Sequence, residues 1–244
     1  IAFNGLLNDG KRFADRLLSV INKDDLNPQL VHVATDGETY GHHHKHGEMA
    51  LSFCLDYIKK DEHAILTNYA QFIELHPPMD EAQIIEDSSW SCVHGIERWR
   101  NNCGCNSGKP GWNQLWRKPL REALDWLRDS VSVIFEQEAS KVVKDPWKAR
   151  NEYINIVLKR SDDNIQRFLK DHALKDASTN RILRIMEMQR HAMLMYTSCG
   201  WFFDEISGIE TIQVMQYASR VIQLANQIGQ VDLEEEFSKR LEEA

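Results

Sequence analysis

The second half of the chain carries a succession of apolar stripes at helical spacing, and this feature constrains the fold most. After Pro119, apolar side chains recur every three or four residues, at Leu120, Leu124, Leu127, Val131, Ile134 and Phe135. This spacing places them on one face of a helix, which must be buried against a neighbour. Further helical stripes occupy residues 147–158, 165–169, 182–196 and 209–228, and the clearest breaks lie at 174–180 and 207–208. We therefore expect a helical domain over residues 119–244.

Residues 29–55 differ from this pattern because they begin with a run suited to a buried strand, residues 30–34, rich in β-branched side chains. The run ends at Asp36-Gly37-Glu38, four histidines follow (His42, His43, His44 and His46), and a helical pattern covers residues 49–55. Strand, polar loop and helix in this order form half of an α/β unit, and the loop is where such folds keep their chemistry. We expect a minor α/β part within residues 1–80.

Composition limits the function classes. The 244 residues are 42% hydrophobic and 27% charged, as in ordinary globular proteins. A formal charge of −8 argues against a nucleic-acid partner. No apolar run approaches the ~20 residues that cross a bilayer, so we expect no membrane partner. Five irregularly spaced cysteines fit reduced thiols, which predicts a cytoplasmic location. The oligomeric state is left open.

Asp36 is the strongest candidate for a catalytic group. A carboxylate just past a strand could act as a general acid, a nucleophile or a metal ligand. An isolated Asp-Gly pair more often forms a turn or caps a helix. The histidines beside it and an aromatic loop downstream favour the functional interpretation.

The histidines first suggest a metal site, because His42 and His46 have the i, i+4 spacing of a helical metal pair. Consecutive histidines point in different directions, however, so at most two could share an ion. We expect His42 to hydrogen-bond a substrate or Asp36, and we assign no metal and no cofactor. A metal-dependent hydrolase that uses these histidines is kept as an alternative function.

Residues 81–118 form a tryptophan-rich region that we expect to bind substrate. Residues 88–126 hold five of the seven tryptophans, and the centre of this stretch is rich in glycine. Trp126 fits a helix face, and we interpret it as a core residue. The others follow no helical stripe and suit flat platforms that stack on sugar rings; they are Trp90, Trp99, Trp112 and Trp116.

The same region contains Cys92-x-His94 and Cys103-Gly104-Cys105, which could together assemble a zinc or iron–sulfur site. The spacing is not the CxxC pair that structural zinc usually uses. Buried free cysteines are therefore the favoured interpretation.

Three segments taken together resemble a known family. Asp36-Gly37-Glu38-Thr39-Tyr40-Gly41-His42 resembles the D-x-E-x-[FY]-G-H segment of glycoside hydrolase family 57. Residues 88–99 and 112–116 resemble the tryptophan-bearing region of that family's branching enzymes and amylases. The tail with SCGWFFDEISGIETIQVMQYA is similar to an uncharacterised helical domain often fused to family 57 catalytic domains. His43-His44 and the Cys-Gly-Cys loop depart from the pattern.

The resemblance implies a mainly α fold with a minor α/β part: the C-terminal piece of a (β/α)7 barrel, followed by a helical bundle. It also implies part of a retaining α-glucan hydrolase or glucanotransferase, with an α-glucan or oligosaccharide as its partner. Asp36 matches the general acid/base, and we expect the nucleophile glutamate upstream of residue 1. The implied substrate-binding residues are Glu38, His42, Trp90, Trp99, Trp112 and Trp116.

Because the chain starts with Ile1 rather than Met, we expect it to be internal to a longer polypeptide and inactive by itself. The complete polypeptide is then expected to be a glycoside hydrolase, a 4-α-glucanotransferase or a branching enzyme. A non-catalytic carbohydrate-binding or scaffolding module is the other alternative.

Overall fold

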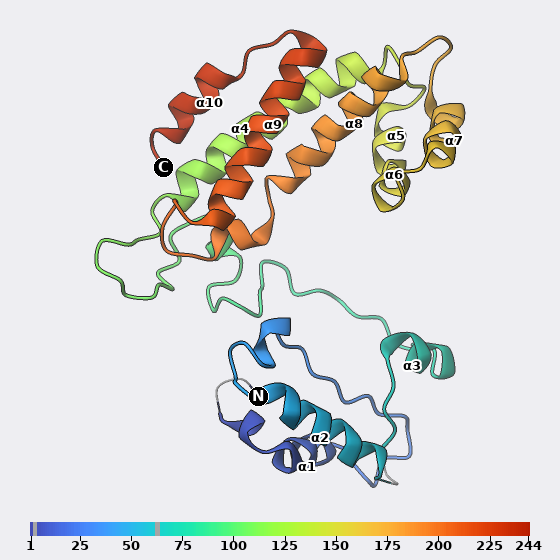
Figure 1. The fold of residues 1–244 in the computed structure, drawn as a ribbon, viewed down its shortest axis with the longest axis vertical. Helices are drawn as coiled ribbons and strands as arrows, with labels where there is room; N and C mark the ends of the chain where they lie inside the picture. Colours follow the sequence, from blue (N-terminus) through green and yellow to red (C-terminus); the bar gives the residue numbers. More distant parts are fainter. Residues whose placement is uncertain (2–3, 62–63) are drawn as a thin grey trace. The chain divides into compact units, whose positions relative to one another are not determined.

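The computed structural model describes residues 1, 4–61 and 64–244, and the chain divides into two compact units, Ile1–Ile84 and Ile85–Ala244. The described residues are mainly α-helical, which confirms the coarse fold class (Figure 1). Strand pairing within these residues is limited to isolated bridges, one joining Tyr40 to His44 and one joining Val143 to Ala173. The division into a catalytic part (residues 1–80), a tryptophan-rich substrate region (81–118) and a helical C-terminal domain (119–244) stays a prediction.

In the first unit, α1 (Gly10–Leu18) packs against α2 (Gly47–Lys59) (Figure 1). The Asp9 side chain begins α1 by accepting hydrogen bonds from the backbone of the first turn. The two helices bury a small core, made of Leu7, Phe13, Ala14, Cys54 and Ile58. Val33 and Tyr40, which flank Asp36 in the sequence, pack against this core.

The strand expected at residues 30–34 is not formed, and neither the α/β part nor the barrel fragment is seen among the described residues. Residues 30–34 are irregular, with Val31 and Val33 half-buried. A strand needs a neighbour to pair its backbone N–H and C=O groups, and no other strand lies within the described ranges. Further along this unit, residues 69–75 form α3 (Tyr69–Leu75), which buries none of its residues.

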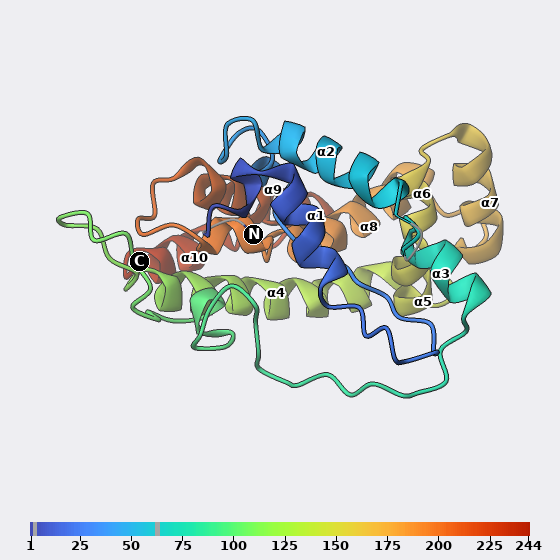
Figure 2. The same ribbon diagram turned by 90° about the horizontal axis from the view of Figure 1, so that it is seen from below.

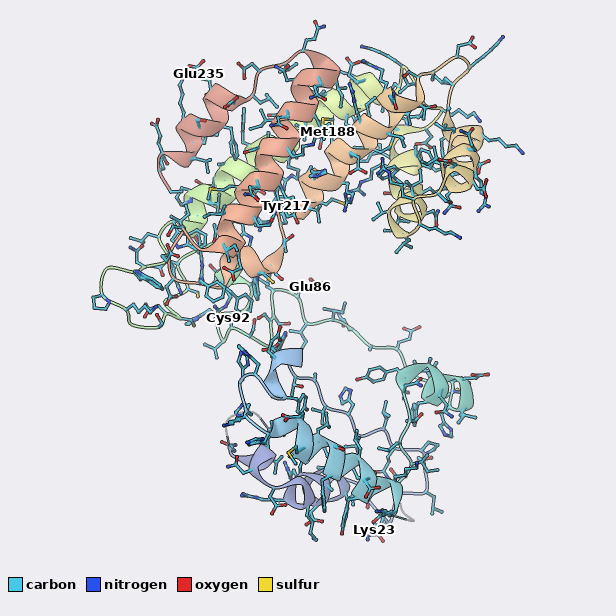
Figure 3. The ribbon with its side chains drawn as sticks, viewed as in Figure 1. Lys23, Glu86, Cys92, Met188, Tyr217 and Glu235 are labelled. Atoms are coloured by element: carbon cyan, nitrogen blue, oxygen red, sulfur yellow. The ribbon has the colours of Figure 1, made fainter. Side chains whose placement is uncertain are left out.

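In the second unit, α4 (Arg117–Ala139), α8 (Thr179–Leu194) and α9 (Ile209–Gly229) pack against one another, and α10 (Glu234–Leu241) lies along α4 (Figures 1 and 2). The expected stripe on α4 forms the centre of the core, because Leu120, Leu124, Leu127 and Val131 are fully buried. Met188 on α8 belongs to the same core (Figure 3).

Three shorter helices extend the bundle: α5 (Pro146–Glu152), α6 (Ile154–Leu158) and α7 (Asp162–His172). Asp145 caps α5 and Ser161 caps α7, each with a side-chain oxygen that accepts a backbone N–H. Within the part of the chain that the structure describes, no helix has both the length and the apolar character needed to span a membrane.

The start of α4 is where the second unit brings distant segments together. The loop that precedes α4 contains the 3₁₀ turn η3 (Glu97–Trp99), which contacts η4 (Ser198–Trp201). η4 in turn packs on α9, where the Thr211 hydroxyl donates to the carbonyl of Gly200 at 2.7 Å. The loop that contains η3 is thus held against the turn between α8 and α9.

Candidate functional site

The loop around Asp36 has a backbone fixed by its own hydrogen bonds. Thr39 N–H donates to the carbonyl of Asp36 at 3.1 Å, and His43 N–H donates to the carbonyl of Glu38 at 2.9 Å. Gly41 N–H donates to the carbonyl of His44 at 3.1 Å. Thr39 is buried at 4% exposure beneath this turn. The sequence therefore forms a compact loop rather than a flexible tail.

The side chains of Asp36 and Glu38 are exposed on this loop. Asp36 precedes the 3₁₀ turn η2 (Gly37–Thr39), but its carboxylate makes no capping hydrogen bond to the described backbone. Of the two simpler interpretations that the sequence offered, the turn is formed, because the Asp36 carbonyl accepts from Thr39 N–H, and the side-chain cap is not. The carboxylate is left accessible to a ligand.

Among the described residues, none of the loop histidines belongs to a group of three or more clustered metal-ligating side chains. His42 and His43 are exposed, and their rings lie 5.2 Å apart in a tilted arrangement. His46 adopts a left-handed backbone and precedes α2. Within the described ranges His42 makes no hydrogen bond to Asp36, and the hydrogen bond expected between His42 and a substrate stays a prediction.

Two of the loop tryptophans are accessible. Trp90 is 84% exposed and Trp112 is 41% exposed. The Lys109 ammonium lies 3.9 Å from the centroid of the Trp112 ring, which is a cation–π contact. Both side chains are accessible to a ligand, and their role in sugar stacking stays a prediction.

The structure places the other two tryptophans differently. Trp116 is 4% exposed and stacks on Trp201 with ring centroids 6.1 Å apart. Trp99 is half-buried and meets Phe202 edge to face at 6.2 Å. Trp116 is therefore packed as a core residue, and its burial does not support the expected role as a sugar platform.

The four cysteine and histidine side chains of the tryptophan-rich region come together. The ligand atoms of Cys92, His94, Cys103 and Cys105 all lie within 4.8 Å of one another. His94 Nδ1 is 3.8 Å from the Sγ of Cys92 and 3.4 Å from the Sγ of Cys105. The cysteines are free thiols, with Cys92 buried and the other two half-buried. Figure 3 labels Cys92 on the loop that leads into α4.

A buried arginine accompanies the cluster. Arg117 is fully buried at the start of α4, and its Nη1 donates to Cys103 Sγ at 3.4 Å. Burial raises the pKa of the Cys103 thiol, but the backbone of Cys105 and the guanidinium outweigh burial and bring the pKa below its ordinary value. Burial together with the charge of Cys103 raises the pKa of Cys105. Within the cluster, the surroundings thus make Cys103 easier to ionise than an ordinary cysteine and make Cys105 harder to ionise.

Two further polar residues support the cluster and were missed by sequence reasoning. The Gln114 side chain is 1% exposed, accepts from Cys103 Sγ at 3.5 Å and donates to the carbonyl of Cys105. It also donates to the carboxylate of Asp204 at 2.9 Å, and Asp204 accepts from the backbone N–H of Ser107. Burial opposes ionisation of Asp204, but these hydrogen bonds lower its pKa overall.

Comparison with known proteins concerns mainly the helical unit. A family model described as "Domain of unknown function (DUF3536)" matches residues 112–244. The match runs from the residues just before α4 to the end of α10, and it includes Gln114, Arg117 and Asp204. No curated protein and no solved structure gives a significant match. The expected uncharacterised helical domain is confirmed.

Proposed function

The chain belongs to the family of the domain of unknown function DUF3536, and we propose that it is part of a retaining α-glucan hydrolase or glucanotransferase. Asp36 serves as its general acid/base, with His42 and Glu38 as substrate contacts. The proposal combines the resemblance of residues 36–42 to glycoside hydrolase family 57 with the geometry of this loop.

The observation that carries the proposal is the state of the Asp36 carboxylate. It is exposed, it makes no capping hydrogen bond to the described backbone, and it sits on a turn whose backbone is closed by hydrogen bonds. A catalytic group needs this combination of a fixed backbone and a side chain free to meet substrate.

In a retaining mechanism Asp36 gives its proton to the glycosidic oxygen while a second carboxylate attacks the anomeric carbon. The glycosidic C–O bond breaks and a glycosyl–enzyme ester forms. Asp36 then takes a proton from water or from an acceptor hydroxyl, whose oxygen replaces the ester. The nucleophile is a glutamate that we do not assign to any residue of this sequence.

The first unit leaves apolar side chains uncovered on two helices, although no barrel strand is formed among the described residues. On α2, Met49, Phe53 and Leu55 are 65%, 51% and 41% exposed. α3 likewise leaves Tyr69, Ile73 and Leu75 exposed. Helices of a barrel cover their apolar faces by packing on strands and on neighbouring helices.

The test is turnover of an α-1,4-glucan by the complete natural polypeptide. Asp36→Asn should lower kcat/KM by about 10²–10⁴-fold, the range typical of general acid–base catalysis. Asp56→Asn is the matched control, because Asp56 is an exposed carboxylate on α2 paired with Lys60. Wild-type turnover by the Asp36→Asn form would refute the proposal.

A non-catalytic carbohydrate-binding module is the second candidate, and the exposure of Trp90 and Trp112 favours it. It predicts that maltooligosaccharides bind the 244-residue chain and that Trp90→Ala weakens this binding. Binding with no turnover by the complete polypeptide would favour the module over the enzyme.

A further inference from the structure

We propose that Cys92, His94, Cys103 and Cys105 bind one Zn²⁺ ion in a closed, four-ligand structural site. This inference is independent of the proposed glucan chemistry, because it rests on the second unit alone. Four protein ligands fill the coordination shell of zinc, which leaves no position for substrate and identifies the site as structural rather than catalytic.

The distances between the ligand atoms fit a tetrahedral ion. With Zn–S bonds of ~2.3 Å and Zn–N bonds of ~2.0 Å, a sulfur and a nitrogen ligand stand roughly 3.5 Å apart and two sulfurs roughly 3.8 Å apart. His94 Nδ1 lies 3.4 Å from Cys105 Sγ and 3.8 Å from Cys92 Sγ. All four ligand atoms lie within 4.8 Å of one another, so only small side-chain shifts are needed.

The backbone explains how two unusually short ligand pairs reach one point. Gly104 has φ +79°, a left-handed conformation between Cys103 and Cys105 that disfavours other residues. After Cys92, a turn closes through the hydrogen bond from Gly95 N–H to the Cys92 carbonyl at 3.1 Å. Each pair thus directs its two ligands to one side, in place of the longer CxxC turn.

The charge around the cluster fits a metal thiolate. A divalent cation with three thiolates carries one net negative charge, and the fully buried guanidinium of Arg117 lies against the Cys103 sulfur at 3.4 Å. A buried arginine beside a neutral thiol would gain little from that contact, since a thiol is a weak acceptor. Gln114 completes an outer shell by holding the carbonyl of Cys105.

Zinc binding would hold together segments of the second unit that are far apart in the sequence. Gln114 and Arg117 connect the cluster to Asp204 and to the carbonyl of Phe203. Zinc would therefore tie loop residues 92–105 to the start of α4 and to the turn after η4. This ordering would fix the base of the loop from which Trp90 and Trp112 project.

The first measurement is elemental analysis of the 244-residue chain, purified without a polyhistidine tag and dialysed against dilute Zn²⁺. We expect one zinc per chain, released when the thiols are blocked by a mercurial reagent. Replacement by Co²⁺ should give thiolate-to-cobalt charge-transfer bands and the intense visible bands of a tetrahedral site. A metal-free chain, stoichiometric iron, or a disulfide among the three cysteines would overturn the assignment.

The second measurement compares single variants. Cys105→Ser removes a half-buried ligand and should weaken zinc affinity at least tenfold. Cys199→Ser is the matched control, because Cys199 is an exposed free cysteine of the same unit outside the cluster. Equal zinc affinity in the two variants would overturn the site. If the circular dichroism of Cys105→Ser shows that the variant is unfolded, its zinc affinity cannot be compared. The cobalt spectrum of the folded wild-type chain then tests the site by itself.

Discussion

Arg117 donates to the sulfur of Cys103 from a position with no solvent exposure, and its other terminal nitrogen donates to the carbonyl of Phe203 at 3.1 Å. One guanidinium thus joins the cysteine loop, the start of α4 and the turn after η4. Burying a charged side chain costs free energy unless a partner group compensates for the lost water. The partners of Arg117 therefore affect the stability of this unit.

Arg117→Met should lower the free energy of unfolding by roughly 3 kcal/mol if Cys103 is a thiolate, because the substitution leaves the half-buried sulfur and the carbonyl of Phe203 without their charged donor. The measurement is urea unfolding followed by circular dichroism. Arg220→Met is the control, since Arg220 is exposed on α9 and bonds only to Gln223 among the described residues. An unchanged or higher stability for Arg117→Met would show that Cys103 is neutral.

Gly95→Ala and Gly108→Ala form a matched pair. Both glycines have positive φ, at +68° and +73°, so alanine costs each about 1 kcal/mol of backbone strain. A Cβ at Gly95 would also lie 2.1 Å from the carbonyl oxygen of Asp87, whereas a Cβ at Gly108 meets nothing within 4 Å. We expect Gly95→Ala to lower the free energy of unfolding by at least ~1 kcal/mol more than Gly108→Ala does, as measured by thermal or urea unfolding. Equal costs would contradict the close approach of these backbones.

Trp116→Ala and Trp112→Ala separate packing from ligand binding. Trp116 is buried against Trp201, so its truncation should cost about 3–5 kcal/mol of stability. Trp112 is 41% exposed, and its loss should change stability by less than ~1 kcal/mol while weakening glucan binding. Calorimetric titration with maltooligosaccharides and urea unfolding check the two variants. The opposite pattern would make Trp116 the sugar platform.

Glu187 gives the helical unit a defined pH dependence. Its carboxylate accepts hydrogen bonds from Tyr153 at 2.6 Å, Arg160 at 2.9 Å and Arg190 at 3.1 Å. Burial raises the pKa of Glu187, but these partners outweigh burial and lower it below the ordinary value of 4.5. The ionised group therefore stabilises the fold above about pH 4.5, and this contribution is lost as pH falls through the lower pKa of the folded state.

Glu187→Gln should cost about 2 kcal/mol near neutral pH, because hydrogen bonds to a charged acceptor are lost. The difference from wild type should narrow when urea unfolding is repeated below about pH 4. Glu235→Gln is the control, since Glu235 pairs with Lys239 on the exposed face of α10 (Figure 3). If the free energy of unfolding of Glu187→Gln differs from that of the wild type by the same amount at both pH values, the role of ionised Glu187 is contradicted.

The sequence predicted the helical unit well because its signal is local. The stripe of Leu120, Leu124 and Leu127 specifies a buried helix face from neighbouring residues alone. The strand at residues 30–34 has an equally local pattern, but a strand also depends on partners far along the chain, and the described residues provide none.

The polar shell of the cysteine cluster could not be predicted for the same reason. Gln114 and Asp204 are 90 positions apart, and nothing in their neighbourhoods indicates the hydrogen bond that joins them. The proposed ligands were partly indicated by the sequence, because the Cys-x-His and Cys-Gly-Cys pairs each place two metal-ligating residue types close together. Trp116 and Trp112 likewise occur in one glycine-rich loop, and only packing against Trp201 distinguishes them.

The role of Asp36 is tested most directly by how the Asp36→Asn variant of the complete polypeptide depends on the leaving group. Loss of a general acid should reduce turnover of an α-1,4-glucan by ~10²-fold or more. An aryl α-glucoside whose leaving group departs without protonation should still form the glycosyl–enzyme at close to the wild-type rate. That divergence is the result we predict. Equal losses in the rate of glycosyl–enzyme formation from the two substrates, or no loss with either, would contradict the assignment of Asp36.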